Sequence, residues 1–213
     1  MSTKRRILDA ARSLMNEKGL KAVTAREICH TLGISPGSFS YHFSDKTLIM
    51  QTLYEELRQE IQVLYTGLET EEVTIVSYLK LHEALFDIQT TYKFFYLNLF
   101  EIFTHYPKIR ASYLAHMIAE RQMAQASILH YQSLGILKKG LSSSIIHRLV
   151  NVGQILNNFW TIDAEMMKGQ LETHHRFHYL QICCGLMEPY LESASLEAYK
   201  HYFEQLAIRL ETA

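Results

Sequence analysis

The sequence predicts an all-α protein of about ten helices, for three reasons. Apolar residues recur at the helical spacings of three, four and seven along most of the 213 residues. The chain holds only 9 Gly and 3 Pro, which is too few turn-forming residues for a sandwich or barrel of many short strands. Apolar residues make up 48% of the chain, enough to offset the entropy of ordering it, so we expect a folded protein.

The first fifty residues predict three short helices. The first runs from about residue 4 to residue 18, with its apolar residues on one face. The run Thr24–Glu27 has the spacing of a capping box and starts the second helix. After a short Gly-containing turn, Ser35 is placed as an N-cap, and Pro36 suits the first position of a third helix that covers about 36–43.

The later segments predict longer helices, with short connections that favour antiparallel neighbours. Glu71 and Glu72 would open one helix, because acidic residues favour a helix N-terminus, and Pro189 would end or bend another. The expected ranges are about 45–68, 71–90, 92–105, 107–133, 145–167, 173–190 and 195–210. We place a head domain at residues 1–47 and a helical body at residues 48–213.

Charge and cysteine content indicate the partner and the compartment. Residues 1–50 carry eight basic and four acidic side chains, whereas the rest holds thirteen basic and eighteen acidic ones, so only the head is suited to a polyanion. Three Cys cannot pair completely, which argues against a secreted disulfide framework. No apolar stretch approaches the roughly 20 residues that span a bilayer, and the N-terminus lacks a signal-peptide core. We expect a soluble cytoplasmic protein without a membrane partner.

The second and third helices have the form of a helix-turn-helix unit, two short helices joined by a tight turn. In such a unit the second helix enters the major groove of double-stranded DNA, with its first residues nearest the base edges. Small side chains there allow close approach, and polar side chains nearby can bind phosphates. On spacing alone, a purely structural helical hairpin is the alternative. The candidate DNA-binding residues are Thr24, Arg26, Ser35, Pro36, Gly37, Ser38, Ser40, Tyr41, His42 and Lys46.

Three stretches of the head resemble the DNA-binding head of the TetR family of bacterial transcription regulators. They are Thr24–Ile28, Leu32–Ser35 and Gly37–Lys46. The resemblance covers about the first fifty residues and matches a motif that specifies a dozen positions. It implies a DNA-binding transcription regulator and not an enzyme.

The resemblance also implies roles for individual head residues. Residues 35–38 match positions that face bases. The positions that contact phosphates are matched by Thr24, Tyr41, His42 and Lys46. Two departures weaken the pattern: Ser40 stands where the family usually has Tyr, and Pro36 stands where a Lys or another base-reading side chain is common.

The body contains two groups of candidate ligand-binding residues. Aromatic and Met side chains, which line adaptable apolar cavities but also fill ordinary cores, are concentrated between residues 86 and 123. Polar residues at 147, 151, 154 and 158 form a stripe on an otherwise apolar helix, which predicts either contacts on two sides or a solvated groove. The candidates are Phe86, Phe95, Asn98, Phe103, Tyr113, Met117, Asn151, Gln154, Asn158 and Trp160.

Dimerisation follows from the resemblance and from an independent argument. Family members pair their last major helices, which correspond here to about 145–167 and 173–190, and hold a small-molecule effector in the body. Independently, one short recognition helix buries too little surface for tight binding, so two heads would meet an inverted-repeat operator. The expected function is a repressor that a small, partly hydrophobic ligand of unknown identity releases. A ligand-activated regulator, or one without a ligand, stays open.

The sequence also contains residues that could bind a metal ion or sense oxidants. His174, His175 and His178 have a spacing compatible with a metal ion, and adjacent Cys183 and Cys184 could sense oxidants if they were exposed. Helix-start histidines and packed thiols are the more common explanations, and no motif for catalysis or cofactor binding emerges. An all-helical enzyme or small-molecule-binding protein without operator binding is the rival class.

Overall fold

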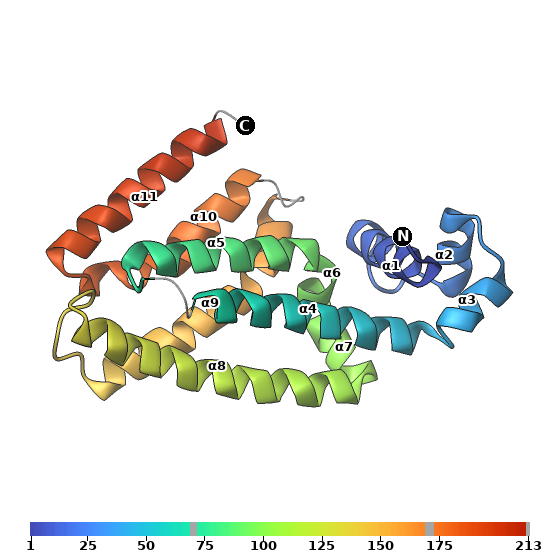
Figure 1. Cartoon of the computed structure of the whole chain (residues 1–213), viewed down its shortest axis with the longest axis horizontal. Coiled ribbons are helices and arrows are strands. Elements are labelled where there is room, and N and C mark those ends of the chain that lie inside the picture. The colour runs from blue at the N-terminus through green and yellow to red at the C-terminus, as the bar shows by residue number, and fades with distance from the viewer. Residues whose placement is uncertain (69–71, 169–172, 212–213) are drawn as a thin grey trace. The chain divides into compact units, whose positions relative to one another are not determined.

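A computed structural model describes residues 1–68, 72–168 and 173–211 (Figure 1). Over these residues the chain forms eleven α-helices and one 3-10 turn, with no strand beyond a single bridge between Leu137 and Leu191. The all-α prediction is confirmed. None of the described helices is both long enough and apolar enough to cross a bilayer.

The three head helices begin where the sequence predicts them. They are α1 (Thr3–Lys18), α2 (Ala25–Leu32) and α3 (Pro36–His42). The Thr24 hydroxyl accepts a hydrogen bond from the Glu27 N–H at 3.2 Å, and Ser35 Oγ accepts one from the Ser38 N–H at 3.1 Å. The Glu27 carboxylate accepts from Lys18 Nζ at 2.6 Å instead of returning to the cap. Gly33 ends α2 at φ +64°, a left-handed conformation that favours glycine.

The chain divides into two compact units. The first comprises Met1–Gln62 and Thr91–Ser112, and the second comprises Val63–Thr90 and Tyr113–Ala213. The first unit therefore contains the head helices, most of α4 (Lys46–Leu68), and the short helices α6 (Lys93–Leu97) and α7 (Leu99–His105). The predicted domain boundary after residue 47 stays a prediction.

The first unit has an apolar core drawn from both of its segments. Ile7 and Ala11 of α1 and Leu53 of α4 are buried, and Phe95 of the second segment stacks on Tyr54 of α4, whereas Leu48, at the start of the apolar spacing of α4, is 40% exposed. The single helix expected over 92–105 is instead two short helices that break at Asn98, whose Nδ2 donates to the Phe94 carbonyl at 2.7 Å. That side-chain bond satisfies one carbonyl at the break.

The second unit is built from α9, α10 and α11, from α5 up to Thr90, and from α8 after Ser112. The bounds of α5, α8, α9, α10 and α11 are, in that order, Ile75–Thr91, Pro107–Ser133, Ser143–Lys168, Thr173–Gly185 and Ser193–Glu211, with a 3-10 turn at Glu188–Tyr190. Inside its core, Phe86 stacks on Trp160 with ring centroids 4.3 Å apart. Leu79, Ala164 and Cys184 belong to the same buried cluster.

Two helix boundaries of the second unit differ from expectation. Helix α5 starts at Ile75, because Thr74 and Ser77 cap each other: the Ser77 N–H donates to Thr74 Oγ1 at 3.1 Å and the Thr74 N–H to Ser77 Oγ at 2.9 Å. Glu72 precedes the helix, and residue 71 lies outside the described residues. Helix α10 ends at Gly185, and Pro189 lies in the 3-10 turn that follows.

Candidate functional site

The exposed surface of α3 carries most of the predicted DNA-binding residues. Ser35, Pro36, Gly37 and Ser40 are exposed, and Ser38 is half-buried. The apolar residues of this helix point the other way, since Phe39 is 3% exposed. One face of a short helix is thus free of bulky side chains at its start, which lets its backbone approach a groove closely.

Tyr41 and His42 lie at the end of the same helix. Tyr41 is 85% exposed, and its ring meets the His42 ring edge-on at 5.0 Å. A hydroxyl in this position can donate to a phosphate, because it is held away from the protein surface by a ring that packs on its neighbour.

Gly37 is not required by the fold. A Cβ added there would meet only Ser35 Oγ, at an ordinary 3.8 Å, and the backbone φ is not positive. Substitution at this position therefore changes the surface that faces a groove without straining α3.

The start of α2 presents further donors. Thr24 and Arg26 are both exposed, and the first N–H groups of the helix lie beside them. The hydroxyl of Thr24 already caps the helix. Thr24 would therefore favour phosphate binding by ordering the helix N-terminus, whose free N–H groups can donate to the phosphate.

Lys46 has a different environment from the one expected of a phosphate-binding side chain. Its Nζ donates to the backbone carbonyl of Leu20, and burial lowers the pKa of the ammonium below its ordinary value. The assignment of Lys46 to DNA stays a prediction.

One exposed basic residue beside the end of α3 is absent from the predicted DNA-binding residues. Lys4 of α1 is exposed, and its ammonium lies over the ring of Phe43 at 5.9 Å. The run Lys4-Arg5-Arg6 was the available signal, but spacing along α1 does not reveal which of the three lies over Phe43, the residue that follows α3.

Charged residues tie α1 to α4 within the first unit. Arg5 Nε donates to Asp9 at 3.0 Å, and Arg5 Nη1 donates to Glu56 of α4 at 2.9 Å. The hydrogen bond from Arg5 holds the pKa of Asp9 below its usual value, despite some burial that acts in the opposite direction.

Hydrogen bonds from both α1 and α4 reach the segment at the start of α6. The Tyr92 hydroxyl donates to Glu60 at 2.6 Å and accepts from Arg12 Nη1 at 3.4 Å. Asn16 binds the backbone on both sides of Tyr92, accepting from the Phe94 N–H and donating to the Thr91 carbonyl, each at 2.9 Å. These contacts explain why residues 91–112 pack with the head helices.

Four predicted ligand-binding residues come together between α8 and α9. The Tyr113 hydroxyl donates to Asn158 Oδ1 at 2.7 Å, and Gln154 Nε2 donates to the Met117 carbonyl at 3.0 Å. Asn158 Nδ2 also lies 3.4 Å from the Met117 sulfur, and Arg121 donates to Gln154 Oε1. Asn158 is only 7% exposed, so this part of the polar stripe is an interhelical network and not a solvated groove.

The other predicted ligand residues are distributed between the two units. Phe86 and Trp160 stack in the core of the second unit, where Trp160 Nε1 donates to Gln89. Asn151 is half-buried on α9. The remaining three, which belong to the first unit, are Phe95, Asn98 and Phe103.

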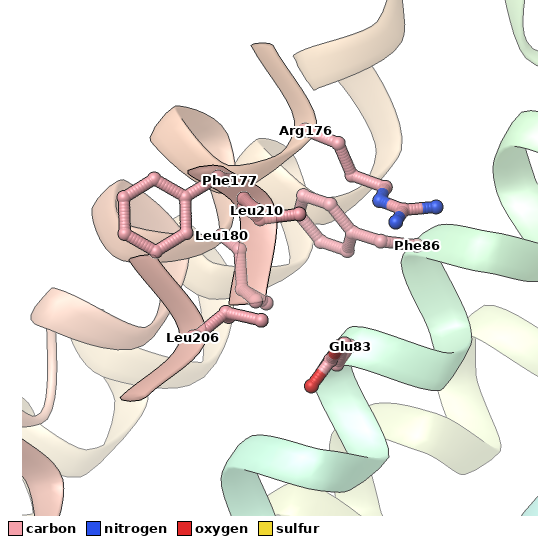
Figure 2. Close-up of a pocket in the computed structure, with 7 residues that line it drawn as sticks. All are labelled: Glu83, Phe86, Arg176, Phe177, Leu180, Leu206 and Leu210. Carbon is pink, nitrogen blue, oxygen red and sulfur yellow. The ribbon is translucent and has the colours of Figure 1, made fainter. Parts of the chain in front are cut away.

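A small hollow lies in the second unit between α5, α10 and α11 (Figure 2). Of the predicted residues it contains only Phe86. Its charged groups already have partners, because Arg176 forms an ion pair with Asp87 and Glu83 accepts from the Tyr202 hydroxyl. The hollow therefore offers mainly apolar contacts.

Helix α9 also exposes a line of apolar side chains. Val152, Ile155, Phe159 and Met166 follow helical spacing and are 36%, 55%, 49% and 80% exposed. Ile182 of α10 is exposed as well. A helix with one apolar face in its own core and another in solvent has the pattern of an interaction surface.

The cysteines lack the features of an oxidant sensor. Cys183 and Cys184 are buried, and burial raises the pKa of Cys183 to about 12 and that of Cys184 well above its ordinary value. A thiol in that state supplies almost no reactive thiolate.

A metal site is not seen in the part of the chain that the structure describes. No group of three potential ligands gathers there, and exposed His178 packs edge-on against Tyr179. The side chains of His174 and His175 lie outside the described residues.

Comparison with known families gives matches along most of the chain. A model described as "Bacterial regulatory proteins, tetR family" matches residues 7–53, and one described as "Bacterial transcriptional repressor" matches residues 56–199. The transcriptional regulator UidR of Escherichia coli K12 is 37% identical over 51 residues, which are 24% of this chain and 26% of that protein. The chain thus matches about a quarter of the length of this relative.

Solved structures share the fold. A TetR-family regulator from Marinobacter aquaeolei VT8 superposes with a TM-score of 0.86 at 21% identity, over 96% of this chain and 98% of the other. The ketosteroid regulator KstR2 of Mycobacterium tuberculosis gives 0.67 at 14% identity, over 90% and 96%. A regulator from Saccharomonospora viridis in complex with choline gives 0.61 at 23% identity, over 83% and 92%.

Proposed function

The chain belongs to the TetR family of bacterial transcription regulators, and from that premise we propose that it is a repressor that a small, partly hydrophobic effector releases from an inverted-repeat operator. As a member of this family it is a DNA-binding transcriptional regulator. Membership favours this function over an enzyme or a carrier without operator binding.

One observation carries the proposal: the face of α3 that is open to solvent is the face that the family motif assigns to DNA. Gly37 and Tyr41 are exposed while Phe39 is buried, so the small residues at the start of the helix can face bases and the hydroxyl at its end can reach a phosphate. Exposed Arg26 extends this surface along α2.

The operator would be read by two copies of the chain. The exposed apolar line on α9, with Ile182 of α10, is the surface that we assign to a homodimer. Two heads about 34–36 Å apart would then meet successive major-groove faces of an inverted repeat.

Release by an effector would follow from a shift in populations. Helices α4 and α8 each contribute residues to both units, so they are continuous connections through which the body can influence the head. An effector that binds better when the two heads are further apart would favour that state, and the heads would no longer match the groove spacing.

A mobility-shift assay with duplex DNA from around the protein's own gene tests the proposal. Arg26→Ala should weaken binding to every duplex similarly and lower the slope of log affinity against log salt by about 1, because it removes one phosphate contact. Gly37→Ala should instead change the preference among duplexes. Lys200→Ala, which removes an exposed charge from α11, is the control and should change neither. Equal effects of Arg26→Ala and Lys200→Ala would contradict the proposed interface.

A further inference from the structure

Three oxygen atoms on one line of α9 have no visible partner. Asn157, Thr161 and Glu165 follow one another at intervals of four residues and so lie on the same side of the helix. Asn157 Oδ1, Thr161 Oγ1 and Glu165 Oε2 are all shielded from solvent, and none finds a hydrogen-bond partner among the described residues. Thr161 as a whole is 0% exposed.

The polar groups on both sides of this line are satisfied. On one side, Gln154 and Asn158 bind Met117 and Tyr113 of α8. On the other, Gln89 of α5 donates to the Asn157 carbonyl at 2.9 Å and accepts from Trp160. Helix α9 is therefore well packed against two neighbours, and the three unsatisfied oxygens are confined to the line between them.

The chemistry of the three groups selects a type of ligand. An amide oxygen and a carboxylate oxygen can only accept hydrogen bonds, and a hydroxyl can accept one as well. Buried acceptors without donors are costly, and a buried carboxylate also requires positive charge. The complement is a molecule that carries N–H donors and a cationic nitrogen.

The spacing of the three side chains along α9 also sets the length of the ligand. At 1.5 Å per residue, successive groups are about 6 Å apart along the axis and the outer two are about 12 Å apart. We infer that the effector of this regulator is a linear aliphatic amine, whose N–H-bearing nitrogens bind Asn157, Thr161 and Glu165 and whose hydrocarbon links lie between them. The inference rests on the proposed function in one respect, namely that an effector exists.

Calorimetric titration of the full-length protein at physiological ionic strength tests the ligand class. The probe is spermidine, a linear triamine, and saturable binding with one molecule per chain is expected. A linear diol and a linear dicarboxylate of similar length should not bind, and a quaternary ammonium such as choline should bind at least tenfold more weakly, because it has no N–H. If the wild-type protein does not bind spermidine, or binds the diol equally well, the inference is wrong.

Variants locate the binding. Glu165→Gln removes the charge at constant size and should weaken spermidine binding at least tenfold, and Thr161→Val should weaken it at least threefold. Glu197→Gln, on the exposed surface of α11, controls for nonspecific attraction of a polycation to acidic residues and should have no effect. Equal losses in Glu165→Gln and Glu197→Gln would overturn the site.

Operator binding without amine separates the two proposals. A protein that binds its operator but not spermidine would leave the regulator intact and refute the amine site. A protein that binds spermidine through Glu165 but no operator would support the site and refute the proposed function. If both bindings occur, spermidine should weaken the operator complex of the wild type and leave that of Glu165→Gln unchanged; equal weakening in both would refute the site as the regulatory one.

Discussion

Replacing Tyr92 by Phe tests how the first unit is held together. Tyr92 is 0% exposed, and its hydroxyl links α4 to α1 by donating to Glu60 at 2.6 Å and accepting from Arg12 at 3.4 Å. Phe keeps the ring on which the Arg12 guanidinium packs, with 5.2 Å between the guanidinium carbon and the ring centroid. The substitution therefore removes the two hydrogen bonds and little else.

The expected loss is about 1.5 kcal/mol. A hydrogen bond to a charged group contributes about 1.5–3 kcal/mol. Glu60 is exposed, so water can replace the lost hydroxyl at its carboxylate. The bond from Arg12, at 3.4 Å, is longer than an ordinary hydrogen bond and adds little, so the total loss lies at the lower end of the range for one such bond. With a urea m-value of about 2–3 kcal/mol/M, the unfolding midpoint should fall by roughly 0.5–0.8 M.

Urea unfolding followed by far-ultraviolet circular dichroism measures this loss. Tyr41→Phe is the matched control, because it removes a hydroxyl from an exposed ring of the same unit, and its midpoint should stay at the wild-type value. If Tyr92→Phe also unfolds at the wild-type midpoint, the Glu60–Tyr92–Arg12 contacts do not stabilise the unit and the reasoning fails.

Three further predictions concern acid stability, thiol reactivity and association. The Arg5 hydrogen bond lowers the pKa of Asp9 in the folded state. Its stabilisation is therefore present above the ordinary Asp pKa of about 3.9 and is lost as pH falls through the lower folded value. In urea titrations, Asp9→Asn should be less stable than the wild type at pH 7 and should lose less of its unfolding free energy on acidification. Burial keeps Cys183 protonated, with a pKa of about 12. A thiol reagent at pH 8 should therefore label neither Cys183 nor Cys184 until denaturant is added. Rapid labelling of these two residues in the native protein would restore the oxidant-sensor alternative. In sedimentation velocity at micromolar concentration, the wild type should be a dimer and Phe159→Asp a monomer, because the substitution places a charge in the apolar line of α9. An unchanged sedimentation coefficient would place the interface elsewhere.

Local signals predicted the head well because the chain there is governed by its caps. Thr24 and Ser35 cap α2 and α3 as their positions indicate, and Pro36 opens α3. These interactions span three residues, so the sequence contains both partners side by side.

Tertiary contacts account for what the sequence did not reveal. Asn16 binds the backbone where α6 begins, at Thr91 and Phe94, from 75 and 78 residues away, and no periodicity in 92–105 indicates such a partner. The amides at 154 and 158 were visible as a stripe, but their burial against α8 depends on Tyr113 and Met117. The side-chain oxygens of Asn157, Thr161 and Glu165 lie on the same helix, α9. The sequence shows their spacing but not that they are buried without hydrogen-bond donors in the described part of the chain.

Footprinting of the operator complex tests the central claim most directly. Methylation of guanine N7 in the major groove should be blocked in two tracts related by inverted symmetry, with centres one helical turn or a multiple of it apart, and Gly37→Ala should alter protection within both tracts. Protection of a single tract, or of none, would contradict a paired α3 that reads the groove.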